Sequence, residues 1–193
     1  MMVKICGITN RADALAAVEG GAAAIGFNFF PASPRYIAPA LAAEIGADLP
    51  PVWKVGVFVD ESPERVAEIA RQAGLHIAQL HGRERPENYP LGIRVWKAIR
   101  VREGQVPQAL FGPAEAVLWD GPASGQSFDW ARIPPGVRNL ILAGGLDAGN
   151  VRQAIAQVRP WGVDACSRLE MAPGRKDRFK MAEFLKAALE AAS

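Results

Sequence analysis

The stretch VKICGITNRADALAAVEGGAAAIGFNF, residues 3–29, decides the fold. It begins with a short apolar run that ends at Cys6, and it finishes with a second run, AIGFNF, from Ala24. Between the two runs, Asn10 is suited to cap a helix and a pair of glycines is suited to end it. Strand, helix and strand in succession predict two parallel strands joined by a right-handed crossover.

The same alternation runs along the rest of the chain. Short segments rich in Val, Ile or Leu, several of them ending in glycine, predict strands. They are VKICGI from Val3, AIGFNF from Ala24, KVGVFV from Lys54, IAQLHG from Ile77, RVWKAI from Arg94, AVLWDG from Ala116, NLILAGG from Asn139 and GVDACS from Gly162.

Amphipathic segments between these runs predict helices. They are NRADALAAVEGG, APALAAEIGADL, ESPERVAEIARQAG, DAGNVRQAIAQV and the tail KDRFKMAEFLKAALEAAS. In the third, Ser62 and Pro63 are typical of an N-cap and a first-turn proline. The segments after the fourth, fifth and sixth strands, ERPENYPLG, EGQVPQALFG and FDWARIPPG, predict single turns.

Eight strands alternating with helices predict an α/β fold of the closed (β/α)8 type, a TIM barrel with some short or degenerate helices. Residues 1–193 would form one barrel domain, with about 24 residues per unit. A doubly wound open sheet is the alternative. It usually has fewer strands, and no G-x-G-x-x-G motif follows the first strand.

Composition excludes several classes of protein. The 22 Lys and Arg residues nearly balance the 20 Asp and Glu, so no strong field favours nucleic acid or a membrane as partner. The start MMVKICGITN does not resemble a signal peptide, and no apolar run approaches the roughly 18 residues of a membrane span. Two cysteines form neither a disulfide framework nor a zinc site. We therefore expect a cytoplasmic protein.

A barrel places its chemistry at the carboxyl ends of its strands. The polar residues there are Cys6, Arg35, Gln79, His81, Asp120, Gly144, Gly145, Asp164, Cys166 and Ser167. Each has an ordinary structural alternative: a small buried cysteine, a surface arginine, a capping histidine, a turn aspartate or a tight glycine turn. Their accumulation at one rim is not required by packing and indicates a ligand site.

These residue types fit one class of reaction. Gly144 and Gly145 leave backbone N–H groups open to a ligand, and loops after the seventh and eighth barrel strands often bind phosphate. Cys6 and Asp120 offer a base and an acid. Because no metal cluster and no nucleotide-binding loop appears, we expect a cofactor-free proton transfer on a phosphorylated sugar.

The motifs VKICGIT, GFNFFPASPR, VGVFV, QLHG, FDW, LAGGL and GVD…SRLE…PG.KD, in this order, resemble those of phosphoribosylanthranilate isomerases over essentially the whole chain. The resemblance implies a cofactor-free barrel of tryptophan biosynthesis that carries out an Amadori rearrangement as a monomer or homodimer. It implies that Cys6 is the general base and Asp120 the general acid. It further implies substrate contacts from Arg35, His81 and Asp164, and a phosphate cradle of Gly144, Gly145, Ser167 and Arg168, without a metal.

Two departures from the family pattern stand out. Most relatives have S-S-G-V-E after the eighth strand, whereas this chain has CSRLE, with Arg168 in place of the glycine. Arg168 is strained if that position has a positive φ, or it adds a cation beside the phosphate. The loop GPASGQSFDW after Asp120 is also short, which predicts a smaller lid.

Two other functions compete with this interpretation. The aminoimidazole carboxamide ribotide isomerase of histidine synthesis performs the same rearrangement with two aspartates, but Cys6 argues against it. A catalytically weak barrel that only binds a sugar phosphate is a different class, and intact Cys6 and Asp120 argue against that class.

Overall fold

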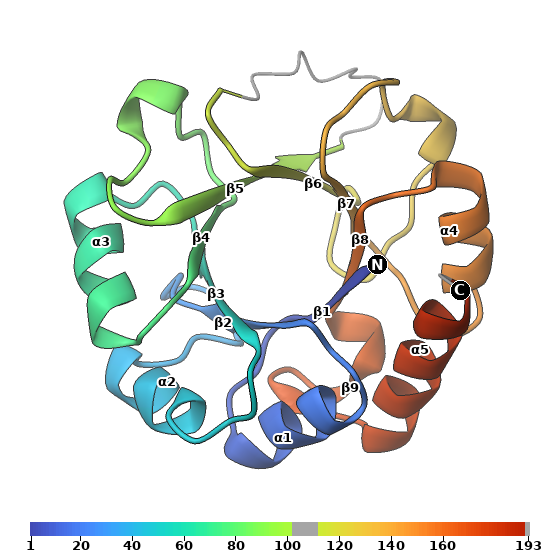
Figure 1. Cartoon of the computed structure of the whole chain (residues 1–193), viewed down its shortest axis with the longest axis horizontal. Helices are drawn as coiled ribbons and strands as arrows, with labels where there is room; N and C mark the ends of the chain where they lie inside the picture. Colours follow the sequence, from blue (N-terminus) through green and yellow to red (C-terminus); the bar gives the residue numbers. More distant parts are fainter. Residues whose placement is uncertain (102–111, 192–193) are drawn as a thin grey trace.

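The computed structural model describes residues 1–101 and 112–191, and its strands close into one parallel barrel in chain order (Figure 1). This confirms the predicted (β/α)8 architecture, and the doubly wound open sheet is wrong. All eight predicted strand segments are strands of the barrel. They are β1 (Met2–Ile5), β2 (Ala24–Asn28), β3 (Trp53–Phe58), β4 (Ile77–Leu80), β5 (Arg94–Arg100), β6 (Ala116–Asp120), β7 (Leu140–Leu142) and β8 (Gly162–Ala165).

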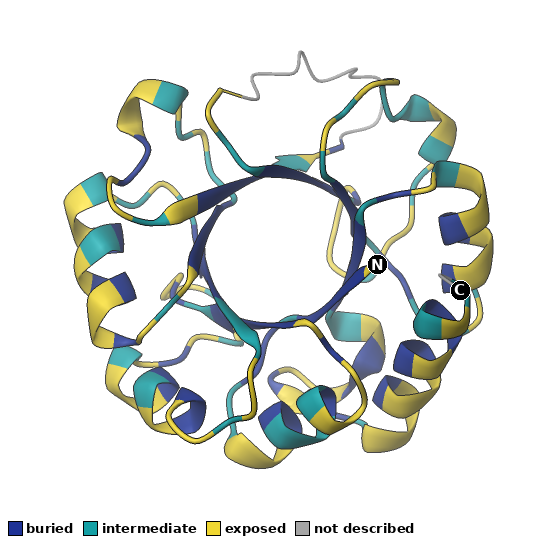
Figure 2. Ribbon diagram, viewed as in Figure 1, coloured by how far each residue is buried: buried dark blue, intermediate teal, exposed yellow. Residues whose placement is uncertain are grey.

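Within residues 1–101 and 112–191, five α-helices cover the outside of the barrel (Figure 1), and their apolar faces are buried against the strands (Figure 2). Side chains cap them as the sequence indicates: Asn10 Oδ1 accepts from the Asp13 N–H at 2.9 Å, and Ser62 Oγ accepts from the Arg65 N–H at 3.3 Å. The helices are α1 (Arg11–Glu19), α2 (Pro39–Gly46), α3 (Pro63–Gln72), α4 (Val151–Val158) and α5 (Arg178–Glu190).

Single turns replace helices in two of the three predicted places. They are the 3-10 turns η1 (Pro86–Asn88), after β4, and η2 (Trp130–Arg132), after β6. The third predicted turn, EGQVPQALFG, falls on residues 103–112 and lies almost wholly outside the described residues.

A small hairpin that the sequence did not predict follows β8. The 3-10 turn η3 (Ser167–Leu169) leads into β9 (Glu170–Ala172), which pairs antiparallel with β10 (Arg175–Lys176). This hairpin lies next to the open end of β8, so its side chains join the rim of the barrel.

Apolar side chains fill the amino-terminal end of the barrel. Trp53, Trp96 and Trp161 pack there with ring centroids 6.0–6.2 Å apart, and each such aromatic pair contributes about 0.5–1.5 kcal/mol beyond its burial. Side chains alternate along a strand, so Met2, Lys4 and Cys6 all point into the barrel. Met2 packs in the apolar layer, and Lys4 and then Cys6 lie progressively closer to the carboxyl end. The interior therefore changes from apolar to polar toward the carboxyl ends of the strands.

Candidate active site

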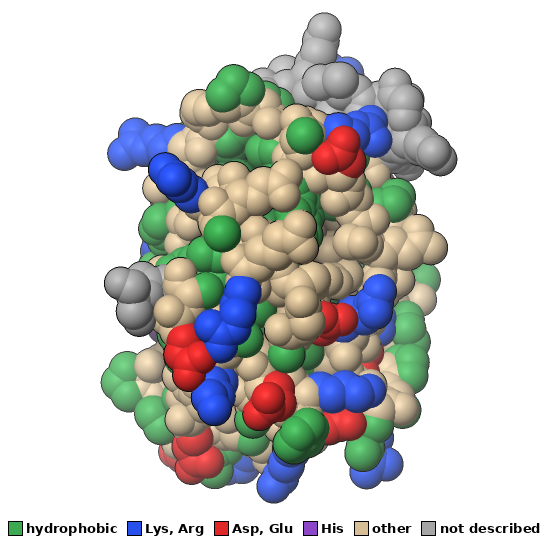
Figure 3. All heavy atoms as spheres, turned by 90° about the vertical axis from the view of Figure 1, so that its right-hand side faces the viewer, with side chains coloured by type: hydrophobic (Ala, Val, Ile, Leu, Met, Phe, Trp, Pro, Cys, Tyr) green, Lys and Arg blue, Asp and Glu red, His purple; other side chains and the backbone are tan. Residues whose placement is uncertain are grey.

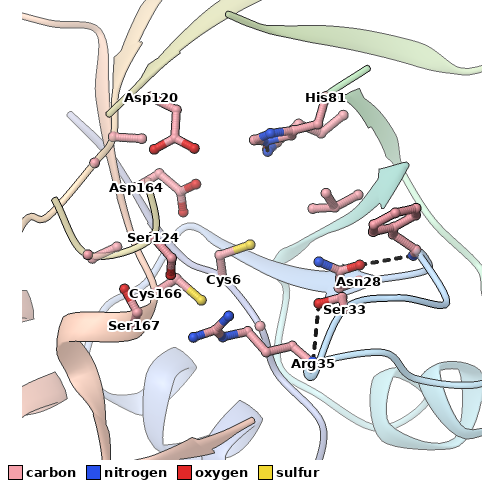
Figure 4. Close-up of a pocket in the computed structure, with 18 of the residues that line it drawn as sticks. Cys6, Asn28, Ser33, Arg35, His81, Asp120, Ser124, Asp164, Cys166 and Ser167 are labelled. Atoms are coloured by element: carbon pink, nitrogen blue, oxygen red, sulfur yellow. Dashed lines mark hydrogen bonds between the residues drawn. The ribbon is translucent and has the colours of Figure 1, made fainter. Parts of the chain in front are cut away.

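A cavity of about 420 Å³ opens at the carboxyl ends of the strands, which is a usual size for a small-molecule site. The structure brings together there every site residue that the sequence predicts: Cys6, Arg35, His81, Asp120, Gly144, Gly145, Asp164, Ser167 and Arg168. Figure 4 shows Cys6, Asp120, Asp164 and His81 around one hollow, with Arg35, Ser167 and Cys166 below them.

Cys6 follows the last residue of β1, and its backbone N–H donates to the Ala165 carbonyl of β8 at 2.9 Å. The next residue, Gly7, has φ +74°, which lets the chain turn away from the mouth. A Cβ at Gly7 would lie 2.8 Å from both Arg35 Cδ and Cys166 Sγ. The glycine is therefore required both by its backbone conformation and by the side chains packed around Cys6.

The surroundings of Cys6 favour its thiolate. Hydrogen bonding to Cys166, together with the ammonium groups of Lys4 and Lys176, outweighs burial and holds the pKa of Cys6 well below its usual range. Hydrogen bonding to Cys6 and burial raise the pKa of the Cys166 thiol. Of the two neighbouring cysteines, Cys6 is thus the one suited to accept a proton near neutral pH.

Asp120 ends β6, on the opposite side of the hollow from Arg35 (Figure 4). Burial raises the pKa of its carboxyl group to about 6, although Arg100 and the Gly121 N–H oppose the shift. A carboxyl group with this pKa can hold a proton at a pH where an exposed aspartate cannot. Cys6 and Asp120 therefore have pKa values displaced in opposite directions, which is the pattern of a base and an acid.

His81 directly follows β4, where Gln79 interacts with its Nε2. Burial, helped by the positive charges of Lys4, Arg100 and Lys97, lowers the pKa of His81 to about 3. The imidazole is therefore neutral at physiological pH and can exchange hydrogen bonds with a ligand without carrying charge.

The hairpin of β9 and β10 holds the Arg35 side chain in place. Its Nε and Nη2 donate to Glu170 Oε1 and Oε2 at 2.9 and 2.7 Å, and Lys176 Nζ donates to Glu170 Oε1 at 3.0 Å. Such a two-point arginine–carboxylate contact fixes the guanidinium plane. Arg35 is therefore a fixed cation in the cavity wall and not the mobile surface arginine of the alternative interpretation.

Asp164 on β8 pairs with a buried lysine that the sequence reasoning overlooked. Lys4 Nζ lies 2.8 Å from Asp164 Oδ2, and the Lys4 side chain is fully buried. Burial raises the pKa of Asp164 to about 7, against the attraction of Lys4. Its second oxygen, Oδ1, is buried and has no hydrogen-bond partner among the described residues, and Asp164 is one of the residues that line the cavity.

Gly144 and Gly145 form a left-handed turn after β7, with φ values of +88° and +63°. A Cβ on either glycine would strike the loop after β6, at 2.3 Å from Gly121 N and 2.5 Å from Ser127 N. Glycine is therefore required at both positions so that the loop after β6 can pack against the turn after β7. The N–H groups of Gly144 and Gly145 donate to no other group in the described part of the chain.

The structure tests one of the two interpretations of Arg168. Its φ is not positive, so the expectation of backbone strain is wrong. Arg168 lies in η3, where its Nε donates to the Gly125 carbonyl at 2.9 Å and its Nη1 is 3.5 Å from Asp147 Oδ2. The side chain is half exposed and lines the cavity beside Ser167.

Sequence reasoning missed four charged residues of the site. Lys4 could have been found, because it precedes Cys6 by two positions and so faces the same side of the strand. Arg100 ends β5 and is the register partner of Asp120. Glu170 and Lys176 lie on the unpredicted hairpin, and no periodic pattern marks strands of two and three residues.

One face of the exterior carries charges of both signs. Figure 3 shows Lys and Arg side chains mixed with Asp and Glu over the face that it presents, without a region of one sign. Within residues 1–101 and 112–191, no helix combines the length and the apolar character needed to cross a membrane.

Known proteins match the chain closely. The sequence pattern of the N-(5'-phosphoribosyl)anthranilate (PRA) isomerase family matches residues 3–187. The N-(5'-phosphoribosyl)anthranilate isomerase of Solibacter usitatus is 51% identical over 195 residues, which cover 97% of each chain.

Solved structures agree with this match. A dimeric phosphoribosylanthranilate isomerase from Thermotoga maritima, solved as engineered monomers, superposes with a TM-score of 0.90 at 44% identity over 98% of this chain and 99% of its own. A phosphoribosylanthranilate isomerase in complex with reduced 1-(o-carboxyphenylamino)-1-deoxyribulose 5-phosphate gives 0.88 at 42% identity, with the same coverage. Sequence, barrel and relatives agree, and the chain belongs to the N-(5'-phosphoribosyl)anthranilate isomerase family.

Proposed function

We propose that this isomerase of tryptophan biosynthesis works by acid–base catalysis with Cys6 as the base and Asp120 as the acid. The observation that carries the proposal is their placement in one cavity with pKa values shifted in opposite directions. The substrate is N-(5'-phosphoribosyl)anthranilate, and the product is the 1-deoxyribulose 5-phosphate derivative.

The reaction moves protons within the substrate and does not change its composition. Asp120 donates its proton to the ring oxygen of the ribose, so the ring opens and a Schiff base forms between C1 and the anthranilate nitrogen. The Cys6 thiolate then removes the proton from C2 to give an enolamine, which becomes the ketone when C1 gains a proton and the C2 hydroxyl loses one. Cys6 then releases its proton and Asp120 takes one up, so both return to their starting states. Because both steps only move protons, the roles of these residues require no cofactor.

The other residues bind the substrate in this proposal. The free N–H groups of Gly144 and Gly145, with Ser167 and Arg168, receive the phosphate. Arg35, His81 and the unpaired oxygen of Asp164 contact the remainder of the molecule. We further propose that residues 1–193 act as one domain in the cytoplasm, as a monomer or homodimer without a nucleic-acid partner.

Turnover of freshly prepared phosphoribosylanthranilate, followed by the loss of anthranilate-type fluorescence, tests the activity directly. We expect turnover without any added metal or cofactor and without change in the presence of a chelator. A chain that binds inorganic phosphate but shows no turnover would support the alternative of a catalytically weak sugar-phosphate barrel instead.

Replacing Arg168 by alanine should raise KM and the inhibition constant of inorganic phosphate by about fivefold and leave kcat within about twofold. A charge-assisted hydrogen bond contributes about 1.5–3 kcal/mol when shielded, and the half exposure of Arg168 reduces this to about 1 kcal/mol. Steady-state kinetics with and without phosphate measure both constants.

The matched control for this variant is Arg152→Ala, which removes an equally exposed arginine on α4 that pairs with Glu190 away from the cavity. Both constants should stay at their original values in this control. Unchanged phosphate inhibition in Arg168→Ala would show that the guanidinium does not reach the phosphate.

Mild oxidation should inactivate the protein reversibly by joining Cys6 to Cys166. The two residues follow the register partners Ile5 and Ala165 of β1 and β8, which places their thiols side by side. Diamide would take one hydrogen from each thiol, so that a disulfide and the reduced diamide form together. A thiol count should fall from two to zero as activity is lost, and dithiothreitol should restore both.

The variant Cys166→Ser separates this reaction from oxidation of Cys6 alone. It should keep its remaining thiol and its activity under the same diamide treatment. Equal sensitivity of the two proteins would mean that no disulfide is involved.

A further inference from the structure

We propose that Lys4 is a positioning residue whose buried ammonium group keeps the Cys6 sulfur ionised, while Asp164 holds that ammonium group in place. This inference rests on the proposed role of Cys6 as the base. Lys4 is not among the described residues that line the cavity, so it acts through the cysteine.

The placement of Lys4 is the first reason. Its side chain is fully buried in the barrel, and its Nζ lies 2.8 Å from Asp164 Oδ2 of the neighbouring strand. Replacing a buried ion pair by apolar side chains of similar size is often neutral or stabilising. Packing alone therefore does not require a lysine here, directly above a layer that is otherwise apolar.

The contact between Lys4 and Cys6 is the second reason. Both side chains point inward from β1, two residues apart, and they meet over the bare backbone of Gly26 on β2. A Cβ at Gly26 would lie 2.8 Å from Cys6 Sγ and 3.1 Å from Lys4 Cε. Because Gly26 has no side chain, the Cys6 sulfur and the end of the Lys4 side chain both fit in the space beside its backbone.

The charges around the sulfur give the third reason. After hydrogen bonding to Cys166, the ammonium group of Lys4 is the strongest influence that lowers the pKa of Cys6. The groups that interact electrostatically with Cys6 come from several elements: Lys4 on β1, Arg35 after β2, Asp120 on β6, Asp164 on β8, Cys166 after it and Lys176 on β10. The Lys4 cation favours the thiolate, whereas negative charge on Cys6 and negative charge on Asp164 oppose each other, so that Cys6 raises the pKa of Asp164.

These opposite effects make a sharp test. In a Cys166→Ser background Cys6 is the only thiol, so its ionisation can be followed by thiolate absorbance near 240 nm as pH is varied. We expect Lys4→Met to raise the midpoint by about 1–3 pH units, the usual effect of removing a neighbouring charge. Asp164→Asn should lower the midpoint, because the Lys4 ammonium group then has no carboxylate partner and its charge stabilises only the Cys6 thiolate.

The pH profile of kcat/KM should follow the same shifts. The limb that reports deprotonation of Cys6 should move to higher pH in Lys4→Met and to lower pH in Asp164→Asn. A loss of activity without these movements would show a structural effect only. The absorbance titration does not depend on turnover, so it also answers the question if the proposed roles in catalysis fail.

A second buried ion pair provides the matched control. Lys97 on β5 pairs with Glu84 at 2.7 Å and is also largely buried. Lys97→Met should therefore cost similar stability yet leave the Cys6 midpoint where it was. If Lys4→Met does not fold, the double variant Lys4→Met with Asp164→Asn removes both charges, and its midpoint should lie above that of Asp164→Asn alone. An unchanged midpoint in the folded variant, or shifts of the same sign in Lys4→Met and Asp164→Asn, would overturn the proposal.

Discussion

Replacing Cys6 by serine should lower kcat by about 10²–10⁴-fold while KM changes far less. The serine hydroxyl fits the same space, but its pKa lies far above neutrality, so it cannot serve as the base that removes the C2 proton. Substrate contacts from the other wall of the cavity remain. Steady-state fluorescence kinetics, with active-site binding checked by phosphate inhibition, separate the two constants.

The control for this prediction is Cys166→Ser, which changes the other thiol of the chain in the same way. It removes a hydrogen-bond partner of Cys6 but keeps the base itself, so its kcat should fall much less. Near-normal kcat in Cys6→Ser would mean that another group removes the proton.

Replacing Asp120 by asparagine should also lower kcat by about 10²–10⁴-fold, again with a smaller change in KM. The amide has the shape of the carboxyl group but no acidic proton for the ring oxygen. Asp120 acts while protonated, so the activity that depends on it is lost as pH rises through its pKa of about 6. That limb of the pH profile of kcat/KM should be absent from the variant.

Asp129, which follows β6 further along the chain, provides the control for Asp120→Asn. Asp129 only caps the turn η2, where its Oδ1 accepts from the Ala131 N–H at 3.0 Å. Asp129→Asn should keep both the turnover and the limb near pH 6. If that limb persists in Asp120→Asn, the acid is a different group.

The barrel could be predicted from the sequence because each strand is a short apolar run bounded by glycine or a polar residue. Cys6, His81 and Asp120 stand where such runs end, and in a parallel barrel these ends meet at one rim. The site residues were therefore predictable from their positions along the chain, without knowledge of any distance between them.

The charged partners of these residues were not predictable in the same way. Lys4 and Asp164 are far apart in the chain, and only the pairing of β1 with β8 brings them together. Glu170 belongs to a hairpin too short to leave a pattern. The absence of strain at Arg168 depends on a dihedral angle, which residue type alone does not determine.

The pair between Lys4 and Asp164 also has a consequence for how the barrel closes. β1 and β8 meet with Lys4 opposite Asp164, and the residues on either side of that aspartate are Val163 and Ala165. A slip of one residue would set an apolar side chain opposite the buried ammonium group, and an unpaired buried charge costs about 3–5 kcal/mol. Misaligned closure is thus penalised at the seam between the first and the last strand, and the aligned barrel is the one that pairs Lys4 with Asp164 beneath Cys6.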